Sequence, residues 1–265
     1  MVPSTGTERR GPSGEDDLTV LLLAGGRGTR VASIAGDLPK HLLPVSGEPF
    51  AALQLRWLET QGVRRVIYCV VGGDERIEAF VVHHGPSSID FQFLRDGERL
   101  LGTGGAIRRA HDVMQFRQDV LVLYGDTLLT IDLADLMRTH RDRGLAATMA
   151  VYRNGGRFDT SNAEFDGARV CYRKVRPGAA APPLPMAWID YGVSALSPAA
   201  LDRMPPGRAF DLAELFEQLG DEGQLGGYEA TERFFEIGTP AALQELETLV
   251  RRSSSLAPGA APYAR

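Results

Sequence analysis

The segment LLLAGGRGTRVASIAGDLPK, residues 21–40, decides the fold of this chain. It continues an apolar run that begins at Leu18, and this run predicts a strand buried on both faces. The strand leads directly into a loop with three glycines, Gly25, Gly26 and Gly28. Because glycine has no Cβ, successive backbone N–H groups of such a loop can closely approach anionic oxygens. The segment therefore predicts a phosphate-binding loop at the end of a strand.

Two familiar phosphate-binding motifs do not fit this loop. A P-loop needs a lysine after its last glycine, whereas Thr29 follows Gly28. A dinucleotide-binding motif needs a third small residue where Val31 stands. A glycine-rich turn without a ligand is an alternative to a binding site. The positive charges of Arg30 and Lys40 favour the binding site.

Lysine is rare in this chain. Only two of its 29 basic residues are lysines, Lys40 and Lys174. Where arginine is the default cation, a remaining lysine suggests a position that needs a compact ammonium rather than a planar guanidinium. Two lysines could also remain by chance.

Composition limits the function classes. The chain has 265 residues, of which 43% are apolar and 24% charged, as in ordinary globular domains. With a net charge of −5, it lacks the basic surface that binds nucleic acids. It has no apolar run of about 18 residues and no signal-peptide core, so we expect a cytoplasmic protein without a membrane partner. Cys69 and Cys171 lie in strand-like runs, where we expect buried, unpaired thiols.

Strands and helices alternate along the first half of the chain. Strands are predicted at 66–71, 89–94 and 119–124, and helices at 50–58, 74–83 and 107–111. This alternation predicts an α/β fold with a doubly wound, mostly parallel sheet. Ligands bind such sheets beyond the carboxyl ends of the strands, so the glycine loop and Asp126 should face one crevice. A helix-capping or turn role is the alternative for Asp126.

The second half of the chain is richer in strands. The dipeptide Asp166-Gly167 lies between two strand-like runs and predicts a hairpin. A strand is predicted at 186–193, and helices near 198–204, 211–219 and 240–250. We predict one domain over 18–251, with disordered tails at 1–17 and 252–265.

These motifs also carry a family resemblance. LAGGRGTR at 23–30, followed by DLPKHLLPV at 37–45, resembles the signature of the sugar-1-phosphate nucleotidylyltransferases. Further motifs follow in the family's order: LGTGGAI at 101–107, YGD at 124–126 and FEIGTP at 235–240. The resemblance implies a Rossmann-like fold, similar to that of GT-A enzymes. It also implies a nucleotide half over about 18–145 and a small, β-rich sugar-phosphate half over about 146–251.

The resemblance also implies a reaction and its residues. A sugar 1-phosphate would attack the α-phosphorus of a nucleoside triphosphate and release pyrophosphate, with Mg²⁺ as cofactor. A phosphate monoester is mostly dianionic at neutral pH, so the enzyme must position it and offset charge rather than deprotonate it. The implied catalytic residues are Arg30, Lys40 and Asp126. Asp126 and Glu236 would hold the metal, and Lys174, Asp190 and Gly192 would bind the sugar phosphate. The implied nucleotide-binding residues are Leu23, Ala24, Gly25, Gly26, Gly28, Thr29, Arg30, Lys40, Gly102, Thr103 and Gly125.

Three residues depart from the commoner family pattern. Glu236 replaces an aspartate, Arg173 a glutamate and Asp190 an asparagine. Glu236 could instead be a solvent-facing strand residue, and the glycines of LGTGGAI could serve close helix packing rather than nucleotide binding. Within the family, the motifs most resemble heptose 1-phosphate guanylyltransferases and their mannose or cyclitol phosphate relatives, which favours GTP. Thymidylyl, uridylyl or cytidylyl transfer to a hexose or cyclitol phosphate remains an alternative.

Two functions outside this enzyme class fit the sequence less well. A metal-dependent glycosyltransferase with a related sheet would carry Asp-x-Asp, which is absent at Asp126-Thr127-Leu128. A non-catalytic regulatory subunit should have lost Lys40 or Asp126, and the chain retains both. We expect a monomer or a small homo-oligomer.

Overall fold

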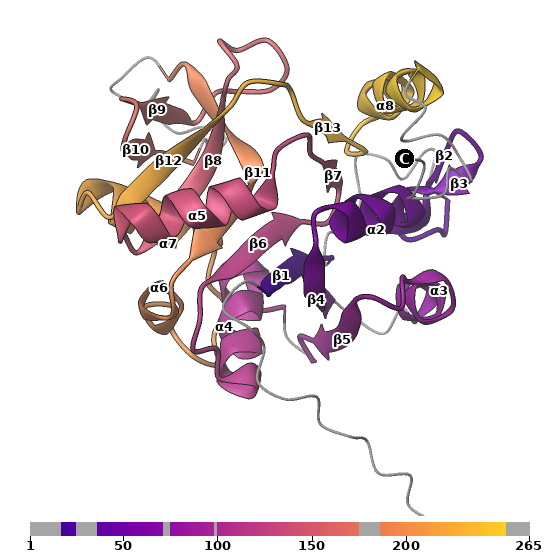
Figure 1. Cartoon of the computed structure of the whole chain (residues 1–265), viewed down its shortest axis with the longest axis horizontal. Helices are drawn as coiled ribbons and strands as arrows, with labels where there is room; N and C mark the ends of the chain where they lie inside the picture. The colour runs from indigo at the N-terminus through magenta and orange to yellow at the C-terminus, as the bar shows by residue number, and fades with distance from the viewer. Residues whose placement is uncertain (1–16, 25–35, 71–74, 98–99, 175–185, 253–265) are drawn as a thin grey trace, which may run out of the picture.

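The computed structural model describes residues 17–24, 36–70, 75–97, 100–174 and 186–252. Within these ranges, nine strands form one mixed sheet (Figure 1). Seven of them lie in the order β10 (Val170–Tyr172), β9 (Ala163–Phe165), β11 (Trp188–Leu196), β6 (Val120–Tyr124), β1 (Leu18–Leu23), β4 (Val63–Val70) and β5 (Asp90–Arg95). Also in this sheet, β8 (Ala147–Arg153) pairs with β11, and β12 (Leu225–Ala230) pairs with β8.

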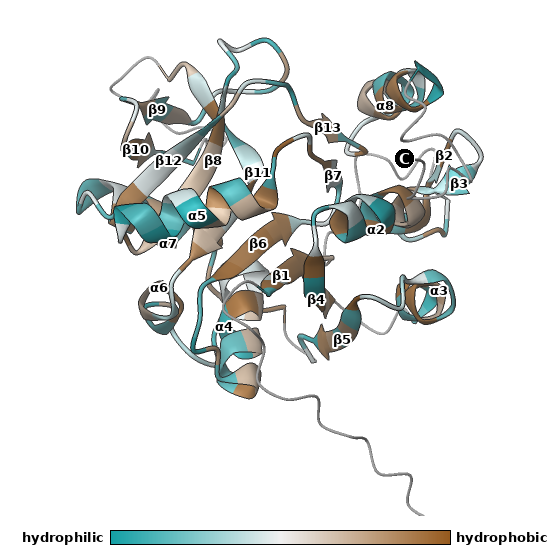
Figure 2. Cartoon of the chain, viewed as in Figure 1, coloured by the Kyte–Doolittle hydropathy of each residue, from teal (hydrophilic) through white to brown (hydrophobic). Residues whose placement is uncertain are grey.

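Helices cover both faces of this sheet. Buried side chains from α2 (Phe50–Thr60), α3 (Arg76–His84), α5 (Leu133–Arg143) and α8 (Pro240–Arg252) belong to one apolar core. Those from α4 (Gly102–Met114), α6 (Pro198–Asp202) and α7 (Leu212–Asp221) belong to a second. Successive side chains of β1 point to opposite faces of the sheet, so Leu22 belongs to the first core and Leu21 to the second. The apolar centre is visible in the brown colour of β1, β4 and β6 (Figure 2).

The centre of the sheet is parallel. β1 pairs in parallel with both β4 and β6, and β4 pairs in parallel with β5. The carboxyl ends of these strands therefore lie along one edge, where Leu23 pairs with Tyr124. β11 runs antiparallel to both β6 and β8 and joins the parallel centre to the additional strands. The predicted doubly wound, mostly parallel sheet with a smaller β-rich region is confirmed.

The predicted hairpin at Asp166-Gly167 is also confirmed, since β9 and β10 pair antiparallel with Phe165 opposite Val170. Several elements were not predicted. They are α5, β12 and two short antiparallel pairs: β7 (Thr127–Leu128) with β13 (Phe235–Glu236), and β2 (Pro44–Val45) with β3 (Glu48–Pro49). Two-residue strands carry no periodicity, so a sequence pattern cannot reveal them.

The glycines of LGTGGAI lie inside α4 rather than in a loop before it. They let the helix pack closely on the segment that precedes α7. A Cβ added at Gly102 would meet Phe210 O at 2.8 Å, and one added at Gly104 would meet the Phe210 ring at 2.6 Å. Gly105 N also donates to Phe210 O at 3.0 Å. Close helix packing, the alternative to nucleotide binding for these glycines, is therefore one of their roles.

The predicted tails at 1–17 and 252–265 lie outside the described residues, except for Asp17 and for Arg252, which ends α8. The division into two halves at about residue 145 stays a prediction. Among the helices in the described ranges, none has the length and apolar character needed to cross a membrane.

Candidate active site

An ion pair lies at the carboxyl edge of the sheet. Lys40 opens the short 3-10 helix η2 (Lys40–Leu42), and Asp126 follows β6. Lys40 Nζ is 2.5 Å from Asp126 Oδ2, and the Lys40 side chain is only 9% exposed. Burial raises the pKa of Asp126, but the charge and hydrogen bond of Lys40 outweigh this effect and hold the pKa below its ordinary value. Asp126 is therefore ionised at neutral pH.

His41 and Gly125 pack tightly beside this pair. His41 is 6% exposed, and its burial lowers the pKa to about 4, so the imidazole is neutral at physiological pH. A Cβ at Gly125 would lie 2.3 Å from His41 Nε2 and 2.8 Å from Leu23 O. Gln54 Nε2 donates to Gly125 O at 3.3 Å and to Thr127 O at 3.0 Å. Only glycine fits here, and the amide of Gln54 fixes the turn that carries Asp126.

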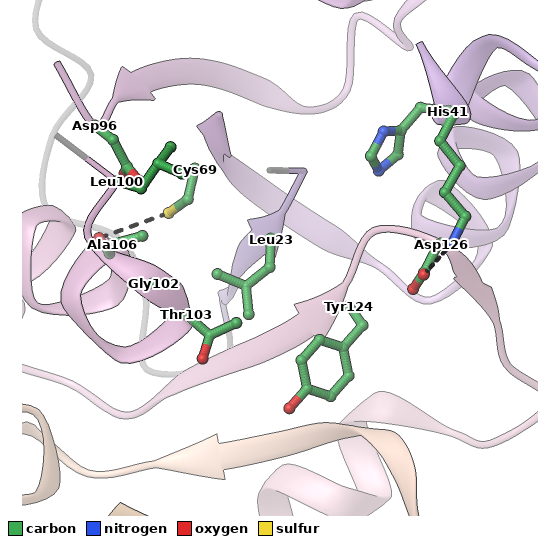
Figure 3. A pocket seen from close by; sticks show the side chains of 11 residues that line it. Leu23, His41, Cys69, Asp96, Leu100, Gly102, Thr103, Ala106, Tyr124 and Asp126 are labelled. Carbon is green, nitrogen blue, oxygen red and sulfur yellow. Dashed lines mark hydrogen bonds and ion pairs between the residues drawn. The ribbon is translucent and has the colours of Figure 1, made fainter. Parts of the chain in front are cut away.

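A first cavity of about 270 Å³ extends from the Lys40–Asp126 pair. It is lined by Leu23, Lys40, His41, Cys69, Asp96, Leu100, Gly102, Thr103, Ala106, Tyr124 and Asp126. Figure 3 shows His41 and Asp126 at one end and Asp96 and Leu100 at the other, with Leu23 and Thr103 between them. The cavity thus has a charged end at the ion pair and a separate carboxylate at its far end.

That far carboxylate, Asp96, is 6% exposed. Its Oδ2 accepts a hydrogen bond from Leu101 N at 3.0 Å. Burial raises the pKa of Asp96, and the Leu101 N–H and the charge of Arg109 oppose this rise. Asp96 was not predicted from the sequence, although it directly follows β5 at the same sheet edge as Asp126. Its position at the carboxyl end of a predicted strand is the feature of the sequence that could have identified Asp96 as a site residue.

A second cavity of about 320 Å³ adjoins the first. The two share three lining residues, Thr103, Tyr124 and Asp126. Further residues of the second cavity are Thr127, Asp159, Thr160, Asn162, Tyr172, Lys174, Ile189, Asp190, Tyr191, Gly192, Asp211, Ala213, Phe234 and Glu236. Two ligands, one in each cavity, would meet at Asp126.

Lys174 has a partner that was not predicted from the sequence. Its ammonium donates to the carboxylate of Asp211, the residue that caps α7. The Thr103 hydroxyl donates to Asp211 Oδ1 at 3.2 Å. Burial raises the pKa of Asp211, but the bonds from Lys174 and its other donors lower it overall. This chain of contacts links α4 of the first cavity to Lys174 in the second.

Asp190 and Gly192 lie together on β11 in the second cavity. Gly192 N donates to Asp190 Oδ1 at 2.9 Å, and the Tyr124 side chain hydrogen-bonds the same carboxylate. Burial nevertheless raises the pKa of Asp190 to about 6. Gly192 has a φ of +99°, a conformation that glycine adopts without strain.

Glu236 reaches the second cavity through the unpredicted β7–β13 pair. Glu236 lies opposite Thr127, and Ile237 N donates to Asp126 O at 3.1 Å. The two carboxylates predicted to hold a metal therefore line one cavity. The described residues contain no group of three or more histidine, cysteine or acidic side chains suited to a metal. Two carboxylates fit Mg²⁺, which takes its other ligands from phosphate oxygens and water.

The structure brings most of the remaining predicted residues together. Leu23, Lys40, Gly102 and Thr103 line the first cavity, and Lys174 lines the second. Ala24 and Gly125 lie at the same edge: Ala24 N donates to Cys69 O, and Gly125 N donates to Leu23 O. Five predicted residues lie outside the described ones: Gly25, Gly26, Gly28, Thr29 and Arg30.

Of the two cysteines, Cys69 is buried and unpaired as expected, and burial raises its pKa to about 12. Cys171 is also unpaired, but it is only partly buried.

The class of fold is defined by solved structures. The crystal structure of HddC from Yersinia pseudotuberculosis superposes with a TM-score of 0.71 at 24% identity, covering 88% of this chain and 99% of that one. The model of the MobA-like NTP transferase domain matches residues 20–231. The chain therefore belongs to the family of MobA-like NTP transferase domains.

Several named relatives are similar to this chain over parts of their length. A mannose-1-phosphate guanylyltransferase of Mycobacterium tuberculosis is 28% identical over 251 residues, 91% of this chain and 65% of that protein. A D-glycero-alpha-D-manno-heptose 1-phosphate guanylyltransferase of Aneurinibacillus thermoaerophilus is 32% identical over 125 residues, 46% of this chain and 52% of that protein. Other relatives are named as glucose-1-phosphate uridylyl- and cytidylyltransferases. The chain spans between half and two thirds of the length of several of these proteins.

Proposed function

We propose that this protein transfers a nucleoside monophosphate from a nucleoside triphosphate, GTP by preference, to a sugar 1-phosphate. The observation that carries this proposal is the pair of adjoining cavities that share Asp126, with Lys40 paired to it. One cavity is suited to the nucleotide and the other to the sugar phosphate. The names of the relatives support the same class of reaction.

The reaction joins two anions, so charge compensation decides its rate. An oxygen of the sugar phosphate forms a bond to the α-phosphorus, and the bond from that phosphorus to the bridging β-oxygen breaks, which releases pyrophosphate. The attacking phosphate is already ionised and needs no general base. The 9%-exposed Lys40 ammonium lies where the cavities meet and can offset the charge of the phosphates there. Lys174, in the second cavity, is placed to bind the phosphate of the acceptor.

Mg²⁺ is the proposed cofactor, held by Asp126 and Glu236. When bound, it neutralises phosphate charge and orients the triphosphate. The ionised state of Asp126 supports this assignment, because its pKa lies below the ordinary value. Lys40 and a metal held by the two carboxylates would then offset the charge of the phosphates from different elements of the fold.

The preference for GTP is supported by Asp96. If the phosphates lie at the Lys40–Asp126 end of the first cavity, the base extends toward the far end, where Asp96 stands (Figure 3). Guanine presents two neighbouring donors, N1–H and the N2 amino group, and a carboxylate accepts both. Uracil and thymine present a single N–H between two carbonyl oxygens, and those oxygens would face the carboxylate unfavourably.

For the acceptor we propose a mannose-type or heptose-type 1-phosphate. The second cavity presents polar side chains suited to sugar hydroxyls, among them Asn162 and Asp190. The guanylyltransferases among the relatives take acceptors of these two types, as their names state.

The test is pyrophosphate release over a panel. Purified protein with Mg²⁺ is given each of five nucleoside triphosphates with mannose, glucose and heptose 1-phosphate. We expect release that requires both substrates and is fastest with GTP. Equal rates with all five bases would remove the preference for GTP and leave the reaction class standing. No release with any combination would refute the proposed function.

A further inference from the structure

One wall of the second cavity is a loop, residues 154–161, that follows β8 and contributes Asp159 and Thr160 to the lining. The loop is organised around Asn154, whose side chain is fully buried. Asn154 Nδ2 donates to Asp159 O at 2.6 Å, and Asn154 Oδ1 accepts from Phe158 N at 3.1 Å. Gly156 N donates to Ser161 Oγ at 3.1 Å. These bonds give the loop a defined internal shape. Near the start of the loop, Gly155 N also donates to Ala187 O at 2.9 Å, and the ring centres of Phe158 and Tyr152 are 6.2 Å apart, but neither contact reaches β13.

Arg233 connects the loop to β13 and α8. Its guanidinium carbon lies 3.8 Å from the ring centre of Phe158 in the loop, and 4.9 Å from that of Phe235 in β13. Arg233 Nη2 also pairs with Glu245 of α8 at 2.8 Å, and Arg233 Nε donates to Phe234 O at 3.3 Å. One side chain thus contacts the loop, β13 and α8.

A second part of the cavity wall begins at the same contact. Phe235 is followed directly by Glu236, and Phe234 and Glu236 both line the second cavity. Phe234 also packs edge-on against Tyr191 of β11, with ring centres 5.6 Å apart. The stack of Phe158, Arg233 and Phe235 therefore joins the wall that carries Asp159 and Thr160 to the wall that carries Glu236.

The stack depends on the shape of the guanidinium. A planar, weakly hydrated cation packs against aromatic faces, and Arg233 faces two rings at once. A lysine would keep the charge, but its compact and strongly hydrated ammonium would not reproduce two flat contacts. Phe158 is 42% exposed, so its position depends on contacts such as this one more than on burial.

We propose that Arg233 is a positioning residue for the sugar-phosphate site: by stacking on Phe158 and Phe235 together, it fixes the 154–161 loop relative to Glu236. This inference rests on the proposed function, which makes the second cavity the acceptor site. Arg233 itself lines neither cavity. Its effect on the reaction is therefore transmitted through the loop and β13.

The test compares four variants by steady-state kinetics with GTP and mannose, glucose or heptose 1-phosphate. We expect Arg233→Ala and Arg233→Lys to raise the KM for the sugar phosphate about 5- to 30-fold, the effect of losing one or two cation–aromatic contacts. The KM for GTP should change less than about twofold. Glu245→Gln, which keeps the stack, should stay close to the parent. Arg203→Ala, which removes an exposed ion pair with Glu222 outside both cavities, is the control.

Hydrogen exchange tests the contact without turnover. The amides of Gly156 and Phe158 are bonded within the loop, and Arg233→Ala should make them exchange faster, whereas amides of β1 should keep their protection. Unchanged loop exchange would overturn the proposal. Faster exchange with an unchanged sugar-phosphate KM would also overturn it, because the contact would then be only structural. If the parent protein used none of these acceptors, the proposed function would fail by itself, and the exchange result would still decide whether Arg233 fixes the loop.

Discussion

The ammonium of Lys40 and the carboxylate of Asp126 lie 2.5 Å apart although the two residues are 86 positions apart in the chain. Lys40 comes from the short helix η2, and Asp126 comes from the end of β6. Their contact lies where two cavities adjoin. A cation and a carboxylate are thus placed together at the point where two phosphorylated ligands would meet.

Lys40→Arg tests whether this position needs an ammonium. If Lys40 were a surface cation, the change should be neutral, within about 0.5 kcal/mol in stability. We expect instead that kcat falls about 10²- to 10³-fold, the loss typical of one aligned electrostatic contact to a transition state. A buried side chain in a tight site cannot exchange a point charge for a planar group without moving it. Parent-like kinetics would show that the rarity of lysine carries no functional information.

Glu236→Gln tests the metal assignment by removing charge at almost constant size. We expect the apparent Mg²⁺ affinity, measured by titrating pyrophosphate release with Mg²⁺, to fall by at least about 10-fold. Even the loss of an outer partner of a metal site has effects of this size. Glu229→Gln, an exposed change on β12 outside both cavities, is the matched control. A parent-like Mg²⁺ titration of Glu236→Gln would show that Asp126 has a different partner.

Asp96→Asn tests the proposed reading of the base. The asparagine can still accept from Leu101 N, so the local backbone should be retained. It replaces one carboxylate oxygen by an amide donor that cannot accept from guanine. We expect kcat/KM for GTP to fall about 10- to 100-fold relative to UTP, because a hydrogen bond to a charged group contributes about 1.5–3 kcal/mol. Asp112→Asn, on the exposed side of α4, should leave the ratio unchanged. If Asp96→Asn left the ratio of kcat/KM for GTP to that for UTP unchanged, Asp96 would have only a structural role in its loop.

Asp190→Asn should give a stability change that depends on pH. The pKa of Asp190 is raised from 3.8 to about 6 by burial, so ionising it in the folded state opposes folding. The penalty is absent below about pH 4, grows between pH 4 and 6, and is complete above pH 6. Asparagine removes it, so the variant should gain stability relative to the parent over that interval, by at most about 3 kcal/mol. Thermal melts from pH 4 to 8 measure this gain. A difference that is constant with pH would contradict the raised pKa.

Local patterns in the sequence predicted much of the fold. The apolar run of β1, the helical spacing of α2 and the Asp166-Gly167 turn each act over a few residues, and each appears in the structure. The order of the motifs also indicated that residues from Leu23 to Glu236 belong to one site. The two cavities bring most of their described members together, and Ala24 and Gly125 lie at the same sheet edge.

Contacts between distant residues were not predictable in the same way. The partner of Lys174 is Asp211. In the sequence Asp211 looks like an ordinary helix cap, and in the structure it both caps α7 and binds Lys174. The β7–β13 pair has two residues in each strand, and the stack on Arg233 joins residues 75 positions apart in the chain. None of these has a periodicity or spacing of its own. They follow from the packing of elements whose positions only the complete fold defines.

The most direct test of the proposed function follows the α-phosphorus. GTP labelled with ³²P at the α-position is incubated with Mg²⁺ and mannose or heptose 1-phosphate, and the products are separated. We expect the label in a nucleotide sugar formed in equal amount to pyrophosphate, and almost none with Asp126→Asn, provided that this variant melts close to the parent. Label that stays in GTP, or that appears only in GMP or GDP whether or not the sugar phosphate is present, would contradict a site where two substrates meet at Asp126.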